Sequence, residues 1–168
     1  MHYEVKQKQE NSKMCFICGL KNPFGIKASF YETDKEKIIA TFTANQEHQG
    51  YPGRLHGGIA AAILDETIGR AINMEKDQEV WAVTIDFSIK YKKPIPLGAE
   101  IRVVGWLTEE NKRYFAGQGK IINPDGRISA TGEGRYLKMP LEKIADFDRE
   151  ANEWKIVDLS GDHKSFDL

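Results

Sequence analysis

The segment from Gly57 to Met74 is apolar on nearly every side of a helix, and it constrains the fold more than any other part of the chain. Its first half contains the uninterrupted run Ile59-Ala60-Ala61-Ala62-Ile63-Leu64. A helix that is apolar all round lies inside a protein rather than on its surface. The rest of the chain must therefore supply the elements that cover this helix.

Most of the remaining chain has the short apolar runs that are typical of β-strands. Turn-forming residues such as Asn123-Pro124-Asp125-Gly126 separate these runs. Two predicted strands precede the helix and four follow it, at residues 26–31, 37–43, 83–91, 101–107, 113–122 and 127–138. This order predicts an α+β protein in which an antiparallel sheet wraps around one long central helix.

The first strand after the helix alternates between apolar and polar residues. Val83, Ile85, Phe87, Ile89 and Tyr91 alternate with Thr84, Asp86, Ser88 and Lys90. Because successive strand residues point to opposite faces, the pattern predicts a half-buried strand with Thr84 on its more polar face.

The two ends of the chain have weaker patterns than its middle. Residues 1–13 are expected to be loose or weakly helical, and the charged segment after Pro140 is expected to be partly helical. The sequence thus divides into a lead at 1–14, one domain at 15–139 and a tail at 140–168.

The charge balance excludes some classes of partner. Lys and Arg number 24 against 25 Asp and Glu, which argues against a nucleic-acid-binding protein. No apolar run is long enough to span a bilayer, and the polar start lacks the apolar core of a signal peptide. With only two cysteines and no disulfide framework, we expect a cytoplasmic location without membrane contact.

The motif His56-Gly57-Gly58 lies where the loop becomes the helix. The first N–H groups of a helix lack internal partners and lie at the positive end of its dipole. Glycine lets another group approach this backbone closely, so the motif could bind a negatively charged oxygen, including one that forms in a transition state. Alternatively, the glycines only permit close packing of the helix on the sheet.

Asp65 is a carboxylate within the most apolar part of the chain, where an uncompensated charge is costly. Acids retained in such places are often functional. The structural alternative is a carboxylate paired with Arg70 or with a backbone donor. Glu66 points about 100° away around the helix, so only one of these two acids can face a given site.

Three segments together resemble the hotdog thioesterase superfamily, and within it the phenylacetate-degradation-type branch that includes mammalian thioesterase-superfamily-member proteins. The segments are Gly50-Tyr51-Pro52-Gly53-Arg54-Leu55-His56-Gly57-Gly58, Leu64-Asp65-Glu66 and Tyr91-Lys92-Lys93-Pro94-Ile95-Pro96-Leu97-Gly98. The resemblance covers roughly residues 15–139. It implies the hotdog fold, hydrolysis of acyl-CoA thioesters, and no metal or bound cofactor.

The resemblance also implies roles for individual residues. Asp65 matches the catalytic acid, as general base or nucleophile, and Gly57 matches the residue whose N–H polarises the thioester carbonyl. His56 matches the residue that opens the helix. Thr84 matches a hydroxyl residue that orients the attacking water; without the resemblance it would be an ordinary strand threonine.

Further residues are implied at the substrate-binding site. Relatives hold water or substrate with an Asn or Gln before His-Gly-Gly; the candidates here are His48 and Gln49, since Gly50 occupies one usual position. Gly58 belongs to the helix start that faces the substrate. The CoA phosphates are expected to contact basic side chains. The positions that match are Lys90, Lys92 and Lys112, each of which could instead be a solvated surface lysine.

The Cys15-x-x-Cys18 motif has several interpretations. A structural zinc site needs four ligands, and the sequence has no second pair at a suitable spacing. A thioredoxin-like role requires a βαβ context that is absent here. Relatives have a similar motif before Asn-Pro-x-Gly, which is Asn22-Pro23-Phe24-Gly25 in this chain, so we interpret the pair as packing or as part of the substrate entrance.

The sequence thus favours an acyl-CoA hydrolase. A hotdog protein that binds acyl-CoA without hydrolysing it, or an enoyl-CoA hydratase, are the alternatives. Asp65 lies eight positions after Gly57, which is about 12 Å along one helix. One thioester could not readily contact both, so we expect a homodimer, or a dimer of dimers, in which two subunits complete each site.

Overall fold

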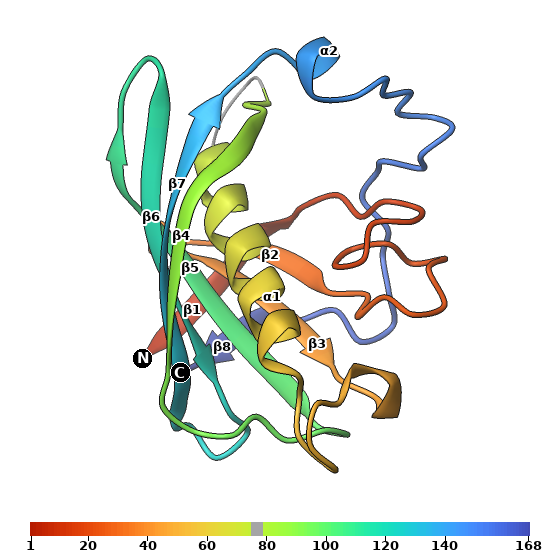
Figure 1. Ribbon diagram of the computed structural model, residues 1–168, viewed down its shortest axis with the longest axis vertical. Helices are drawn as coiled ribbons and strands as arrows, with labels where there is room; N and C mark the ends of the chain where they lie inside the picture. Colours follow the sequence, from red (N-terminus) through yellow and green to blue (C-terminus); the bar gives the residue numbers. More distant parts are fainter. Residues whose placement is uncertain (75–78) are drawn as a thin grey trace.

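The computed structural model describes residues 1–74 and 79–168 and contains an antiparallel sheet of eight strands around one long helix (Figure 1). The strands are β1 (His2–Lys8), β2 (Ser29–Thr33), β3 (Ile38–Thr43), β4 (Ala82–Tyr91), β5 (Glu100–Glu110), β6 (Tyr114–Ile122), β7 (Ile128–Lys138) and β8 (Ser165–Asp167). Their order across the sheet is β4-β7-β6-β5-β3-β2-β1-β8. The predicted α+β class and the sheet wrapped around a central helix are confirmed.

Helix α1 (Gly57–Arg70) lies in the concave face of the sheet and continues into a 3₁₀ turn, η2 (Ala71–Asn73) (Figure 1). It packs on β5, β6 and β7 through the fully buried Ile63, Leu64 and Ile68. A Cβ atom added at Gly117 of β6 would lie 2.7 Å from the Ile68 side chain, so glycine permits this close approach. Although α1 is apolar, no helix in the described residues is long and apolar enough to cross a membrane.

All six predicted strands are present, with ends shifted by up to three residues. The prediction for residues 1–13 was wrong, because His2–Lys8 form strand β1 between β2 and β8. Its sequence is mostly polar, with Tyr3 and Lys8 as its buried residues, so it lacks a strong apolar signal. The predicted helical part of the tail is the single turn α2 (Leu141–Ile144), and the tail ends in β8.

The alternation predicted for β4 was wrong at its start. A β-bulge between Thr84 and Asp86 breaks the register with β7. Such a bulge adds one residue and reverses the side-chain direction beyond it. Ile85 is therefore 52% exposed, whereas Thr84 lies on the helix-facing side together with Phe87 and Ile89, which pack against the core.

Candidate active site

Helix α1 has two flanks with different neighbours. We call the side that carries Asp65 and faces the edge strand β4 the β4 flank, because Asp65 contacts Thr84 there. We call the opposite side, which carries Glu66 and Arg70 and faces the N-terminal segment 9–25, the loop flank. The residues predicted for catalysis lie on the β4 flank or at the start of the helix.

The helix begins with one N–H group that is available to a ligand. His56 is the N-cap, and its Nδ1 accepts a hydrogen bond of 2.9 Å from the Gly58 N–H. Across the described residues, the Gly57 N–H has no hydrogen-bond partner. The positive end of the helix dipole is therefore presented through the Gly57 N–H. The N–H of Gly58, a residue expected to face the substrate, already donates to the His56 cap.

The Thr84 hydroxyl donates to both oxygens of the Asp65 carboxylate, at 3.0 and 3.2 Å. Burial raises the pKa of Asp65 above its ordinary value, and hydrogen bonding to Thr84 opposes this shift. Arg70 pairs with Glu66 instead, so the structural alternative for Asp65, an ion pair with Arg70, is not present. Asp65 is thus a partly desolvated acid without a cationic partner among residues 1–74 and 79–168.

The Thr84 hydroxyl holds the Asp65 carboxylate. The role implied by the resemblance, orienting the attacking water, stays a prediction. This contact exists because the bulge at Ile85 brings Thr84 to the helix-facing side. Thr84 can therefore fix the direction in which Asp65 presents its oxygens.

Two tyrosines for which the sequence predicted no role connect the sheet to the site. The Tyr91 hydroxyl donates to the Gly57 carbonyl at 2.7 Å and so ties the end of β4 to the helix start. The Tyr136 hydroxyl donates to the Asp65 carbonyl at 3.0 Å. Tyrosines in strands are usually packing residues, so a single sequence offers no sign that these two reach the helix backbone.

A cavity of about 430 Å³ opens beside the Asp65–Thr84 pair. It extends from β4 across the outer side of α1 to the N-terminal and C-terminal segments. Its wall includes the aromatic side chains of Phe115, Tyr136, Trp81 and Trp154. The cavity has the size of a small-molecule site, and charged side chains line it as well. Glu66 lies on its wall together with Asp65, so both acids border one cavity, contrary to the prediction that only one could face a site. The other charged residues on the wall are Lys8, Glu10, Glu32, Arg70, Glu79 and Arg149.

His48 and Gln49, the predicted loop residues, hold the loop rather than face the cavity. His48 is buried in the 3₁₀ turn η1 (Gln46–His48); its Nδ1 accepts from the Asn45 N–H and its Nε2 donates to the Phe24 carbonyl. No ring nitrogen of His48 is left for a substrate in this arrangement. Gln49 accepts from the Gly53 N–H at 3.2 Å and remains exposed.

The three predicted lysines do not gather within one chain. Lys90 lies near the end of β4, opposite Thr131 of β7, and Lys92 comes directly after β4. Lys112 lies in the turn next to Arg113, whose carbonyl accepts from the Lys138 N–H. Thr131 and Lys138 are seven residues apart in one strand, which corresponds to about 23 Å. A single basic cluster would therefore require another subunit.

Comparison with protein families gives one match that covers the site. Residues 52–130, which contain the helix start, Asp65 and Thr84, match the family model described as the thioesterase superfamily. The matched region extends from the loop before His56 into β7.

Individual relatives agree with this match. Rat acyl-coenzyme A thioesterase THEM4 is 36% identical over 112 residues, which are 66% of this chain and 47% of the relative. The chain therefore spans about half the length of this curated relative. A crystal structure of a thioesterase superfamily protein aligns with a TM-score of 0.66 and 25% identity, over 73% of this chain and 59% of that one. A Bacillus halodurans protein crystallised with CoA shares the fold, with a TM-score of 0.59 and 24% identity over 66% of this chain and 73% of that one.

Proposed function

The chain belongs to the thioesterase superfamily, and on that premise we propose that it is an acyl-CoA thioesterase. One observation carries the proposal. Asp65 is a partly buried carboxylate with a raised pKa, oriented by Thr84 and placed on the wall of a cavity. A carboxylate with these properties suits general-base or nucleophilic catalysis.

The reaction converts an acyl-CoA and water to a carboxylic acid and CoA. As a general base, Asp65 takes a proton from water, and the oxygen of that water attacks the thioester carbonyl carbon. The carbon–sulfur bond then breaks, and the departing CoA sulfur takes up a proton. The Gly57 N–H stabilises the negative charge that develops on the carbonyl oxygen. As a nucleophile, Asp65 would instead form an anhydride that water hydrolyses.

The separation of Gly57 and Asp65 supports a site made by two subunits. The two residues lie eight positions apart in α1, about 12 Å along its axis, whereas one carbonyl must contact both within roughly 3 Å or through one water. Strand β4 forms an edge of the sheet, and Asp65 faces that edge. Two copies joined along β4 by a two-fold axis would bring Gly57 of one copy near Asp65 of the other.

Such a dimer also accounts for the separated lysines. Lys90 and Lys92 of one copy and Lys112 of the other could then contact different phosphates of the same CoA. The structure with CoA in the Bacillus halodurans protein makes this a reasonable ligand for the same fold. Gln49 remains a candidate for contact with water or substrate through its amide N–H₂ group.

A thiol-release assay with aromatic, short-chain and long-chain acyl-CoAs tests the proposal. We expect free CoA to appear in proportion to free acid for at least one class. Binding of acyl-CoA without thiol release would make the chain an acyl-CoA-binding protein. Loss of the enoyl double bond without thiol release would make it a hydratase.

Mixing two inactive variants tests the shared site. Asp65→Asn removes the carboxylate, and Gly57→Pro removes the N–H at the first helical position, where proline is tolerated. His56 has φ −63° and ψ 134°, an extended conformation that is compatible with a following proline. After random exchange half of the dimers are hybrids with one intact site each, so about a quarter of all sites should recover.

A matched variant separates the loss of the N–H from crowding. A Cβ at position 57 would lie 3.3 Å from the Tyr91 hydroxyl, so Gly57→Ala adds the same contact but keeps the N–H. We expect Gly57→Ala to retain far more activity than Gly57→Pro. If verified hybrid dimers regain no activity, both groups act within one subunit and the shared-site proposal is wrong.

A further inference from the structure

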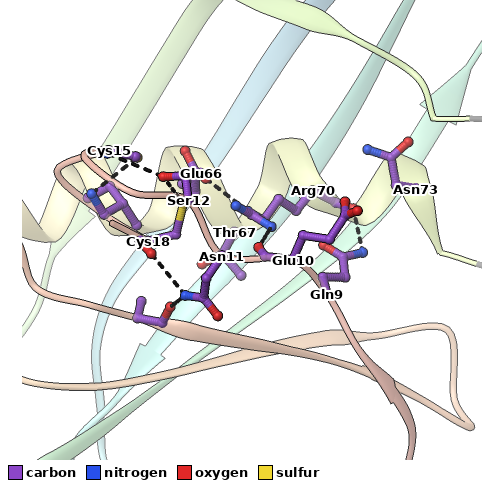
Figure 2. A network of polar contacts seen from close by, with 12 residues as sticks. Gln9, Glu10, Asn11, Ser12, Cys15, Cys18, Glu66, Thr67, Arg70 and Asn73 are labelled. Atoms are coloured by element: carbon purple, nitrogen blue, oxygen red, sulfur yellow. Dashed lines mark hydrogen bonds and ion pairs between the residues drawn. The ribbon is translucent and has the colours of Figure 1, made fainter. Parts of the chain in front are cut away.

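The loop flank contains a group of metal-binding side chains that the proposed reaction does not use. The Sγ atoms of Cys15 and Cys18 and a carboxylate oxygen of Glu66 all lie within 4.8 Å of one another (Figure 2). Cys18 is fully buried, and both cysteines are free thiols. The sequence offered only two ligands here, because the third comes from helix α1, about 50 residues further along the chain.

The loop that carries the cysteines is built to hold the two sulfurs together. The Gly19 N–H donates to the Cys15 carbonyl at 2.8 Å, and the Ile17 N–H donates to the Cys15 Sγ at 3.3 Å. A Cβ at position 19 would lie only 2.3 Å from the Cys15 carbonyl oxygen, so the turn requires glycine. The Ser12 hydroxyl lies 3.4 Å from the Cys18 Sγ.

The geometry points to a site for zinc or a similar thiophilic divalent cation, and we propose that Cys15, Cys18 and Glu66 bind such an ion. Tetrahedral zinc with Zn–S bonds of about 2.3 Å and Zn–O bonds of about 2.1 Å places its ligands roughly 3.5–3.8 Å apart. A separation of at most 4.8 Å needs only small side-chain movements to reach this geometry. A fourth position remains for water. Coordination would release the two thiol protons to solvent.

The charges around the three ligands suit a bound dication. Two thiolates and one carboxylate carry −3, and the ion with the nearby Arg70 carries +3, so the buried group is neutral. Arg70 is 8% exposed and pairs with Glu66 at 2.8 Å, while its Nη2 has no partner in the described residues. That donor is free to bond a negatively charged ligand of the ion, such as a thiolate sulfur.

Glu66 supplies the third ligand of the proposed site. Its carboxylate lies beside both sulfurs, so it increases the affinity for a cation bound between them.

The ion would tie the loop to the helix next to the active site. The same loop reaches η1, because the Phe24 carbonyl accepts from His48 and the Phe16 ring packs edge-on against the His48 ring. The His48 carbonyl in turn accepts from the N–H of His56, the helix cap. Metal binding at the cysteines would therefore stabilise the segment that leads into the helix. This inference does not depend on the proposed hydrolysis.

Metal binding can be measured directly on the reduced full-length chain. After incubation with zinc chloride and desalting, we expect one zinc ion per chain, with affinity determined by competition with a chromophoric chelator. Cys15→Ser and Cys18→Ser should each abolish stoichiometric binding, and Glu66→Gln should weaken it at least about 10-fold. Glu10→Gln is the matched control, because Glu10 pairs with Arg149 on the same flank but is not a ligand. Its zinc affinity should equal that of the wild type.

Cobalt gives a test that needs no variant, in case the cysteine variants do not fold. The wild-type chain with Co²⁺ should show a thiolate-to-cobalt charge-transfer absorption that zinc abolishes by displacement. The proposal is wrong if the reduced wild type retains no zinc and shows no such absorption. It is equally wrong if folded cysteine variants bind zinc as well as the wild type does.

Discussion

Asp65 and Glu66 are neighbours in helix α1, yet their carboxylates lie on different flanks and have different partners. On the β4 flank, the Asp65 carboxylate accepts from the Thr84 hydroxyl and has no cationic partner in the described part of the chain. On the loop flank, Glu66 pairs with the buried Arg70, which also donates to the Glu10 carbonyl at 3.0 Å and stacks on Phe30. Hydrogen bonding offsets only part of the desolvation of Asp65, whereas Glu66 has an ion pair.

The difference shows how one helix can carry a candidate catalytic acid on one flank and a structural ion pair on the other. An acid without a cationic partner keeps a raised pKa and can exchange protons with a substrate. An acid paired with an arginine holds that arginine where it donates to the N-terminal loop. A 100° step around the helix separates their side-chain partners, although the charge of Glu66 still raises the pKa of Asp65.

The largest expected effect comes from Asp65→Asn on the β4 flank. The amide cannot act as a base or nucleophile, so kcat should fall by about 10²–10⁴ in the thiol-release assay. The unfolding free energy should change little, because asparagine has the same shape and its oxygen can still accept from Thr84. Asp86→Asn is the control, because Asp86 is exposed on the face of β4 that points away from α1. The activity of this variant should match that of the wild type. Near-normal turnover by Asp65→Asn would show that the β4 flank does not carry the catalytic acid.

On the loop flank we expect a loss of stability instead. Arg70→Met leaves Glu66 without its cation, and breaking a buried pair typically costs 3–5 kcal/mol. Because the Glu66 side chain is 27% exposed, we expect about 2–3 kcal/mol, measured by urea unfolding in reductant and chelator. The double variant Arg70→Met/Glu66→Leu should recover part of this loss, since no unpaired charge remains. Equal destabilisation by the single and double variants would show that the arginine acts through packing alone.

The sequence predicted those features that depend on local patterns. The period of the apolar residues identified α1 and the strands β2 to β7. Asp65 was identified because it is a charged residue within an apolar helix. These signals are local because helix and strand periods extend over only a few residues. The family resemblance added Gly57, His56 and Thr84, whose geometry at the helix start and beside Asp65 is now described.

The features that the sequence did not predict depend on contacts between distant residues. Strand β1 is stabilised by pairing with β2 and with β8 at the other end of the chain, so its own polar sequence gave no signal. Glu66 joins Cys15 and Cys18 only in the folded chain. His48 resembled a substrate ligand in the sequence, but both ring nitrogens bond the backbone of neighbouring loops.

The bulge in β4 is the unpredicted feature with the most direct effect on the β4 flank. A regular strand would direct Thr84 away from α1 and place Ile85 toward it, as the alternation in the sequence suggested. The extra residue leaves Ile85 exposed and brings the Thr84 hydroxyl to the Asp65 carboxylate. Mutation of Thr84 therefore tests how the β4 flank orients Asp65.

The smallest effect is expected from Thr84→Val, which keeps the β-branched shape and removes the hydroxyl. Hydrogen bonds to charged groups contribute about 1.5–3 kcal/mol, and because this one is partly exposed we expect the lower end, a loss of roughly 10-fold in kcat. KM should change little, because Thr84 acts on Asp65 rather than on the substrate, and Thr84→Ser should restore most of kcat. Steady-state kinetics of the three proteins across one acyl-CoA concentration series measures both constants. If Thr84→Ser is as impaired as Thr84→Val, the methyl group and not the hydroxyl supports the site. If KM rises while kcat stays constant, Thr84 contacts the substrate, and Asp65 keeps its orientation without a side-chain partner.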